Sequence, residues 1–338
     1  MRRFVIDRQK LTENIASIRA RAGVPIIAVL DADACGMGMF RMAELLAEQG
    51  VELFAVSDPA DAVRLRGRGF ITQTILVLRS TAVAEDIEQI IAADAVASIG
   101  SMQAAQALIA ACAERGIAAQ GHLLVQTGWG MSGFSADDYE DIRQVYLSTP
   151  DLEITGMYTL TADEKTPSKQ AAVLTELAAR LRKDGIDPGM LHAAEDRALR
   201  SSDTSVFLDA VRVHSAFGGR MEPLHTVGWL ETEIVEVQEL ARGSVCAGLQ
   251  LRQPITAAVI PVGLADGIEE PEPESRFRRA SKKGGSSVTI AEQPVSVLTI
   301  GQYDTLLNVT GMAVKPGDLV RIEIDPAQYD RRTEQYEI

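Results

Sequence analysis

Side chains that could transfer protons, attack a substrate or bind a metal gather where apolar, strand-like runs end. Asp31 directly follows the run "PIIAVL" (residues 25–30), and Cys35 lies four residues further along. A carboxylate at the end of a buried strand is costly unless another group compensates its charge. The other candidates are His192, Glu195, Asp196, Arg212, His214 and Cys246. Carboxylates and imidazoles suit acid–base chemistry or divalent cations, and thiols suit nucleophilic chemistry.

A repeating pattern of strands and helices must position most of these residues. Apolar runs alternate with amphipathic helical runs, and the strand-like runs are residues 25–30, 52–57, 74–79, 95–100, 122–127, 152–160, 190–194 and 210–214. They are apolar nearly throughout, as strands buried on both faces are. Eight such units predict an α/β fold, a (β/α)8 TIM-type barrel, which carries its chemistry at the carboxyl ends of its strands. A helix over residues 7–23 is expected to precede the barrel.

The pattern changes after about residue 225. Strand-like runs separated by Gly, Pro and polar turns follow, at residues 232–240, 256–264, 287–300, 305–310 and 318–324. We therefore expect a barrel domain over residues 1–225 and a smaller all-β domain over residues 226–338. The segment 269–287 has an acidic half and then a basic half, which predicts a solvated hairpin loop. A small anion site on its basic half is the alternative.

Composition excludes several classes of partner. The chain has 338 residues, of which 46% are hydrophobic, and a net charge of −14. This charge repels phosphate backbones and anionic lipids, so we expect no nucleic-acid partner and no membrane partner. No apolar run is long enough to span a bilayer, and the first residues lack the long apolar segment of a signal peptide. The three cysteines lie far apart, which favours a reducing, cytoplasmic location.

Two local patterns have simple interpretations. The segment "GWGMSG" (residues 128–133) matches the glycine pattern of dinucleotide sites, but it belongs to the fifth barrel unit. The doubly wound half-sheet that such a site needs is missing, so we reject this interpretation. The eighth strand should close against the first, which predicts an ion pair between Arg212 and Asp31 at the barrel mouth, because buried charges persist when paired.

The whole chain resembles the alanine racemase family, in which a pyridoxal-phosphate barrel precedes a β domain. The resemblance rests on short motifs that occur in the family's order: "AVLDADACGMG" (28–38), "HLLVQTGWGMSGF" (122–134), "LHAAEDRALR" (191–200), "DAVRVHSAFGG" (209–219), "PVGLADG" (261–267) and "PGDLVRI" (316–322). So many matches in sequence make the implied fold specific.

The same resemblance implies that the coenzyme chemistry is lost. Asp31 stands where the family keeps the lysine that condenses with the coenzyme aldehyde, and only an amine can do so. On the phosphate side, Cys35 replaces a tyrosine, Glu195 and Asp196 replace an Asn-Ser pair, and His214 replaces a glycine. Each carboxylate would repel the phosphate by about 4 kcal/mol per unit charge pair at about 4 Å and an effective dielectric of about 20.

The remaining family positions also predict that the coenzyme chemistry is lost. Arg212 matches the arginine that faces the pyridine nitrogen, and it alone is retained. The family's second arginine, its strand lysine, its catalytic tyrosine, its substrate-side tyrosine and its M-D-Q motif are replaced by Met131, Leu124, Ala247, Leu264 and residues 301–303. The resemblance therefore predicts a homologue that binds no pyridoxal phosphate and does not racemise alanine.

The predicted function is that of a non-catalytic binding or regulatory protein, which retains the family's head-to-tail homodimer. One alternative is cofactor-independent racemisation by two thiols, Cys35 and the partner's Cys246. A second is metal-assisted chemistry, with ligands drawn from Asp31, His192, Glu195, Asp196 and His214. A third is a divergent pyridoxal-phosphate racemase that uses Lys165 or Lys169, although both are expected at the solvated start of a helix.

Overall fold

The chain forms two units, which we describe from a computed structural model. Contacts group Leu11–His225 as one unit, and group Met1–Lys10 with Thr226–Ile338 as the other. The division falls after residue 225, and the first ten residues group with the β unit, to which they contribute strand β1 (Arg3–Ile6). The structure describes residues 2–128, 130–148, 150–161, 167–219, 221–246, 249–268, 287–324 and 334–337.

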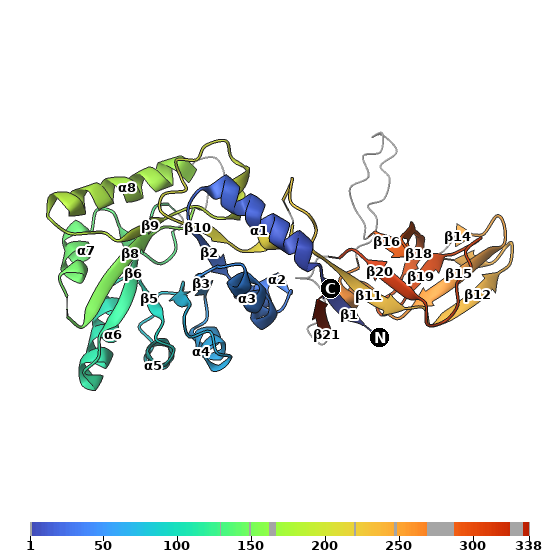
Figure 1. Cartoon of the computed structure of the whole chain (residues 1–338), viewed down its shortest axis with the longest axis horizontal. Helices are drawn as coiled ribbons and strands as arrows, with labels where there is room; N and C mark the ends of the chain where they lie inside the picture. The colour runs from blue at the N-terminus through green and yellow to red at the C-terminus, as the bar shows by residue number, and fades with distance from the viewer. Residues whose placement is uncertain are drawn as a thin grey trace. The chain divides into compact units, whose positions relative to one another are not determined.

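The first unit is a nearly closed parallel barrel (Figure 1), as the sequence predicted. Its strands are β2 (Ile26–Val29), β3 (Leu53–Val56), β4 (Thr74–Val77), β5 (Val96–Ile99), β6 (Ala119–Gln126), β8 (Leu152–Tyr158), β9 (Met190–His192) and β10 (Val211–Val213). The order is β10-β2-β3-β4-β5-β6-β8-β9, and a parallel bridge between His192 and Ala210 joins the two ends. The short β7 (Phe134–Ser135) pairs with β6 outside this path. All eight predicted strand runs are confirmed.

Helices connect these strands, and local sequence signals explain where they begin and end. They are α1 (Arg8–Ala22), α2 (Asp31–Cys35), α3 (Met39–Glu48), α4 (Pro59–Gly67), α5 (Ala84–Ala92), α6 (Met102–Arg115), α7 (Tyr139–Tyr146) and α8 (Pro167–Lys183), with 3-10 turns η1 (Asp196–Arg200) and η2 (Ser215–Gly218). The Ser101 hydroxyl accepts the Ala104 N–H and caps α6, whose end is the left-handed Gly116. Helix α1 buries Leu11, Ile15 and Ile18 as its spacing predicts.

The second unit is all-β, as predicted. One six-stranded sheet has the order β17-β16-β20-β11-β1-β21 and a four-stranded sheet has the order β12-β15-β19-β18. The bounds are β1 (Arg3–Ile6), β11 (Gly228–Glu233), β12 (Glu236–Leu240), β13 (Val245–Cys246), β14 (Leu249–Gln250), β15 (Ile255–Ile260), β16 (Val288–Ile290), β17 (Gln293–Pro294), β18 (Ser296–Ile300), β19 (Thr305–Asn308), β20 (Leu319–Ile322) and β21 (Glu334–Glu337), with the 3-10 turn η3 (Leu264–Asp266). The sequence did not predict β1 and β21. The charged loop prediction for 269–287 lies almost wholly outside the described residues.

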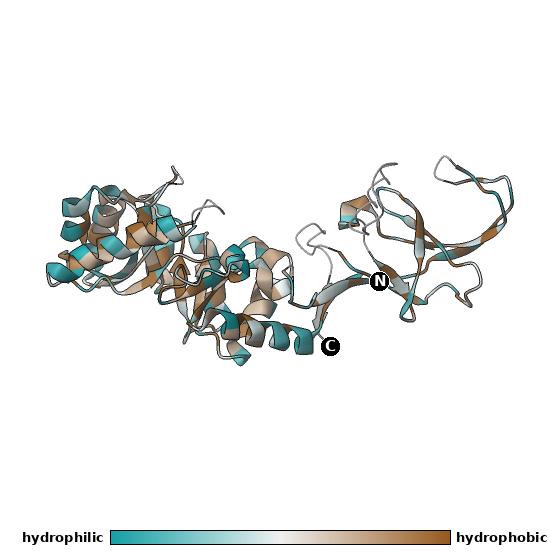
Figure 2. Ribbon diagram, turned by 90° about the horizontal axis from the view of Figure 1, so that it is seen from above, coloured by the Kyte–Doolittle hydropathy of each residue, from teal (hydrophilic) through white to brown (hydrophobic). Residues whose placement is uncertain are grey.

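Burial follows the strand pattern in each unit. The barrel strands carry mostly hydrophobic residues, whereas hydrophilic residues gather on the surrounding helices (Figure 2). Within the described part of the chain, no helix combines the length and the apolar character needed to cross a bilayer.

Candidate functional site

The barrel mouth contains a left-handed turn directly after β2. Residues Ala32, Asp33, Ala34 and Cys35 have φ between 51° and 57°. L-residues in this conformation cost about 1–2 kcal/mol each, so four in succession are strained. Backbone bonds hold the turn, among them the Gly36 N–H to the Ala32 carbonyl at 2.9 Å. Strain of this kind concentrates at functional sites.

Asp31 opens this turn, and its carboxylate is bound by the next strand. The Ser57 N–H donates to Oδ1 and the Ser57 hydroxyl donates to Oδ2, both at 2.6 Å. Ser57 follows β3, which pairs with β2, so the two strand ends bring these groups together. In the described part of the chain no bond joins Asp31 to Arg212, so the predicted ion pair is wrong. The negative charge is instead balanced by hydrogen-bond donors of a neighbouring strand end.

Arg212 points to the opposite side of the mouth, toward β8 and β9. Its side chain is only 2% exposed, and it pairs with Glu195 at 3.0 Å between Nη2 and Oε1. Nη2 also donates to the Thr159 carbonyl at 2.8 Å and the Ala193 carbonyl at 3.2 Å, and Nη1 contacts His192 Nδ1 at 2.7 Å. The guanidinium is therefore fully engaged by the interior of the barrel.

Two buried histidines continue this chain of contacts. His192 Nε2 lies 3.0 Å from His122 Nδ1. An arginine can only donate, so His192 Nδ1 accepts from Arg212 and His192 carries its proton on Nε2. That proton is donated to His122 Nδ1, which places the His122 proton on Nε2. Burial, and then the charge of Arg212, lower the pKa of His122 to about 4 and that of His192 well below its usual value, so both rings are neutral near pH 7.

Tyr158 completes the packing of these rings. It stacks on His192 with a centroid distance of 4.8 Å and an interplanar angle of 3°. Its hydroxyl donates to the Leu78 carbonyl at 2.9 Å and lies 2.7 Å from the Ser98 hydroxyl. Burial raises the pKa of Tyr158 to about 12, against the opposing effects of the Ser98 hydrogen bond and the Arg212 charge. The phenol therefore stays neutral, and it packs against His192 with its hydroxyl hydrogen-bonded.

Asp196 occupies a concavity formed by successive backbone amides. Its Oδ1 accepts the N–H of His214 at 2.8 Å, and its Oδ2 accepts the N–H of Ser215 at 2.7 Å and of Ala216 at 3.1 Å. The Ser215 hydroxyl also donates to Oδ2 at 2.7 Å. Consecutive amides that converge in this way form an anion-binding nest. In this chain the anion is the protein's own carboxylate.

Cys35 and His214 are in contact across the mouth. Sγ of Cys35 lies 3.1 Å from His214 Nε2, which in turn lies 2.9 Å from the Asp31 carbonyl. A carbonyl only accepts, so His214 Nε2 carries a proton and donates it toward both atoms. In this arrangement Nε2 cannot remove the proton of the thiol, although it would stabilise a thiolate. The side chain of Cys246 lies outside the described residues.

The candidates do not assemble into a metal centre. Among the described residues, no three His, Cys, Asp or Glu side chains are placed to hold a metal ion. His192 has both ring nitrogens in hydrogen bonds, and Asp196 has both oxygens bound by the loop 214–216. Of the five side chains proposed as metal ligands, His192 and Glu195 are engaged by Arg212, and Asp31 and Asp196 by hydrogen-bond donors.

The remaining family positions lie in varied surroundings. Leu124 is buried and Met131 is 65% exposed. Lys169 is exposed at the start of α8, and Lys165 lies outside the described residues, as does Ala247. In the β unit, Leu264 and Tyr303 are exposed, and the Leu264 N–H donates to the Gly301 carbonyl at 3.0 Å.

Several residues that build the site were not singled out from the sequence. They are Ser57, His122, Tyr158, Thr159 and Ser215. Ser57, Thr159 and Ser215 follow strand ends, which is the signal that identified the other candidates. His122 and Tyr158 lie inside apolar strands, where a polar side chain requires a partner.

Comparisons with known proteins agree with this architecture. The family model described as "Alanine racemase, N-terminal domain" matches residues 6–219. An alanine racemase of Limosilactobacillus fermentum is 29% identical over 287 residues, which are 78% of this chain and 75% of that protein. An alanine racemase of Methanococcus maripaludis is 25% identical over 342 residues and covers 94% of this chain and 87% of its own length.

Solved structures share the fold over essentially the whole chain. The alanine racemase of Clostridium difficile 630 has a TM-score of 0.83 at 22% identity and covers 99% of this chain and 96% of its own. The alanine racemase from D-cycloserine-producing Streptomyces lavendulae has a TM-score of 0.84 at 20% identity, with 100% and 97% covered. At these identities the structural likeness establishes the fold.

Proposed function

Because the chain belongs to the alanine racemase family through its barrel, residues 6–219, we propose that it is a non-catalytic member that binds no pyridoxal phosphate. It acts as a binding or regulatory protein, and it keeps the head-to-tail homodimer of the family. The family is normally dependent on pyridoxal phosphate, so the proposal rests on how the mouth residues fit that coenzyme. The observation that carries it is the position of Asp196.

The phosphate side of the mouth is occupied by this carboxylate. By resemblance, the family's phosphate is approached by the backbone at position 214 and by the pair at 195–196. Here the amides of His214, Ser215 and Ala216 donate to Asp196. A phosphate would have to displace Asp196 and would then face its charge at close range, at about 4 kcal/mol per unit charge pair at about 4 Å in an effective dielectric of about 20. These residues do not fit the phosphate.

The aldehyde side of the mouth does not fit the coenzyme either. Asp31 has no amine, and both of its carboxylate oxygens are bound by Ser57. The retained Arg212 pairs with Glu195 and donates to backbone carbonyls and to His192, which leaves it serving the barrel interior. Asp31, Glu195 and Asp196 thus each have a hydrogen-bond or ion-pair partner within the protein.

One observation favours a second candidate function, cofactor-independent thiol chemistry. The Cys35 thiol contacts the His214 imidazole at 3.1 Å inside a strained turn. Proton exchange at a substrate carbon by two thiols requires a second thiol, for which the partner's Cys246 is the candidate. Racemisation of an amino acid that persists in wild-type protein but is lost in Cys35→Ser and in Cys246→Ser would establish this chemistry.

Reconstitution with pyridoxal phosphate tests the main proposal. We expect wild-type protein to show no aldimine absorbance and no covalent coenzyme after borohydride reduction. Asp31→Lys combined with Asp196→Ser should restore both, because the amine and the amide nest then become available. Asp137→Lys, at an exposed position on the barrel, is the matched control for non-specific reaction with a surface lysine.

Two outcomes bear directly on the proposal. Reduced wild-type protein with the coenzyme attached to Lys165 or Lys169, located by peptide mapping, would overturn it. Native mass spectrometry of the purified protein should detect the homodimer without bound coenzyme, together with any molecule that co-purifies. A strictly monomeric protein would remove the dimer from the proposal.

A further inference from the structure

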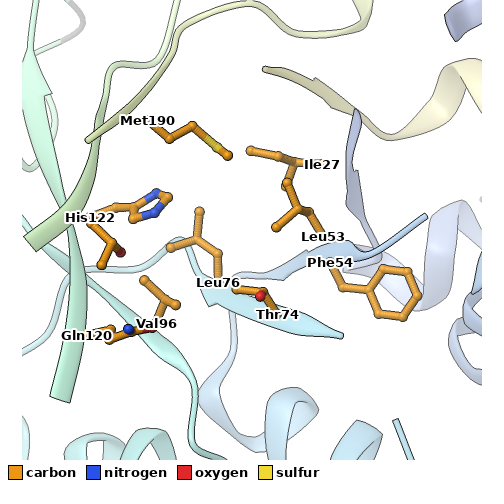
Figure 3. A pocket seen from close by; sticks show the side chains of 10 residues that line it. Ile27, Leu53, Phe54, Thr74, Leu76, Val96, Gln120, His122 and Met190 are labelled. Atoms are coloured by element: carbon orange, nitrogen blue, oxygen red, sulfur yellow. The ribbon is translucent and has the colours of Figure 1, made fainter. Parts of the chain in front are cut away.

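A cavity lies at the opposite end of the barrel from the mouth. Its volume is about 220 Å³. Leu53, Thr74, Val96 and Met190 are the first residues of β3, β4, β5 and β9, so this is the amino-terminal end of the strands. Figure 3 shows side chains from several strands surrounding it, among them Ile27, Leu76, His122 and Met190.

The cavity has an apolar interior and a polar rim. Ile27, Leu76 and Val96 are buried, whereas Thr74 and Gln120 are exposed. No lining residue carries a full charge near pH 7, because His122 is neutral. An apolar cavity of about 150 Å³ can hold benzene. The space here therefore suits a six-membered ring with a small substituent, and an ion would lose its hydration without finding a counter-charge.

His122 supplies the one polar group that is both buried and directed at this space. The ring is 8% exposed, and its Nδ1 accepts the proton of His192. Its Nε2 carries a proton for which no acceptor is present in the described part of the chain. The ring lies against Gly156, where an added Cβ would be 2.6 Å from Nε2. In Figure 3 the ring faces the space between Met190 and Leu76.

We propose that this cavity binds a small, uncharged, mostly apolar molecule whose single oxygen accepts a hydrogen bond from His122 Nε2. Among the described residues, only Thr232 Oγ1 is a side-chain atom cut off from solvent without a partner, so His122 Nε2 is open to the cavity, where a ligand oxygen can accept its hydrogen bond in place of water. The apolar remainder of the ligand packs against Ile27, Leu76 and Val96. The site is separate from the mouth and does not depend on the function proposed above.

A larger hollow beside the cavity offers a route of entry. It has a volume of about 920 Å³, and Leu53 and Met190 line both spaces. Both side chains are half-buried. Methionine is unbranched and flexible, so Met190 can move aside to admit a ligand.

Cyclohexanone and methylcyclohexane form a matched pair of probes, because their rings have similar size and only the ketone accepts a hydrogen bond. After each affinity is corrected for the probe's transfer from water to octanol, we expect cyclohexanone to bind at least about fivefold tighter, because methylcyclohexane leaves the His122 donor without an acceptor. Binding is measured from the methyl resonances of Met190, Leu76 and Val96 in the full-length protein. Equal corrected affinities for the two probes, or shifts located elsewhere, would overturn the proposal.

The His122 proton provides a second test that needs no variant. In protein labelled with ¹⁵N-histidine, His122 should show the Nε2–H tautomer, and cyclohexanone but not methylcyclohexane should shift that Nε2 resonance. The Nδ1–H tautomer at His122 would contradict the proposal. Met190→Phe fills the cavity and should abolish both probe responses, whereas Met131→Phe, at an exposed site, should leave them unchanged.

Discussion

Two groups of polar residues in the barrel differ in how their side chains are satisfied. The buried polar column comprises Arg212, His192, His122 and Tyr158, which are bonded or stacked to one another. The mouth turns, residues 31–36 and 214–216, lie at the strand ends, and several of their residues are half-buried. By the resemblance, Arg212 in the column matches a family arginine, and the turns hold positions that are predicted to have lost the family's coenzyme-binding residues.

The difference shows which part of such a site the fold itself needs. A residue of the column that was lost would leave buried donors and acceptors unpaired, at about 1–3 kcal/mol each. On the function proposed above, the turns hold no coenzyme, so their donors need another acceptor. Asp196 supplies that acceptor for the amides of 214–216, and Ser57 supplies donors for Asp31.

Removal of Arg212 should have the largest effect on stability. Arg212→Leu leaves Glu195 without its cation, and His192 and the Thr159 carbonyl without their donor. Glu195 is 35% exposed, so the main cost comes from the buried acceptors left unpaired, at about 1–3 kcal/mol each, and we expect a total loss of about 3–5 kcal/mol. Urea unfolding followed by circular dichroism measures this loss.

Arg64 provides the matched control, because it is exposed and pairs only with Asp61 within the described part of the chain, apart from its contact with the Phe40 ring. Arg64→Leu should change the unfolding free energy by no more than about 0.5 kcal/mol. Equal losses in the two variants would mean that the column is no more important for the fold than the surface.

The column should also make stability depend on pH. The pKa of His122 is about 4 in the folded chain and about 6.5 when unfolded. Between these values the unfolded chain binds more protons, so stability present above pH 6.5 is lost as the pH falls toward 4. The loss attributable to His122 reaches about 3 kcal/mol at pH 4. His192 shifts in the same direction.

Urea unfolding at several pH values between 4 and 7.5 measures how the free energy of unfolding depends on pH. His122→Gln should flatten the slope, whereas His225→Gln, at a largely exposed side chain, should leave it unchanged. A wild-type free energy of unfolding that does not vary over this range would show that the column histidines are not held neutral.

A substitution at Asp196 tests the mouth turns, because Asp196 accepts hydrogen bonds from the amides of residues 214–216. Asp196→Ala removes the acceptor for three amides and the Ser215 hydroxyl, which should cost about 2 kcal/mol, since hydrogen bonds to charged groups are worth about 1.5–3 kcal/mol. The vacated nest should then bind inorganic phosphate. We expect phosphate to raise the melting temperature of Asp196→Ala but not of wild-type protein, by linkage. An equal effect on both would mean that Asp196 does not block the nest.

The sequence predicted the fold well and the site in part. Unbroken apolar runs such as residues 25–30 and 210–214 identified the barrel strands, and their order placed Asp31, Asp196 and Arg212 at one end. Pairings between side chains were harder to predict, because Asp31 is bound by Ser57, a residue type common at any strand end. The left-handed turn after β2 could not be predicted, since four non-glycine residues disfavour it.

The smallest effect is expected at Ser57, which binds Asp31 at the position that the resemblance assigns to the family lysine. Ser57→Ala removes the hydroxyl from Asp31 Oδ2 but keeps the backbone N–H on Oδ1. We expect a loss of about 1 kcal/mol in urea unfolding, the net value of one hydrogen bond. Ser17→Ala, an exposed hydroxyl on α1, is the control and should have little effect. If Ser57→Ala costs nothing, water satisfies Asp31 equally well, and its carboxylate remains accessible to a ligand.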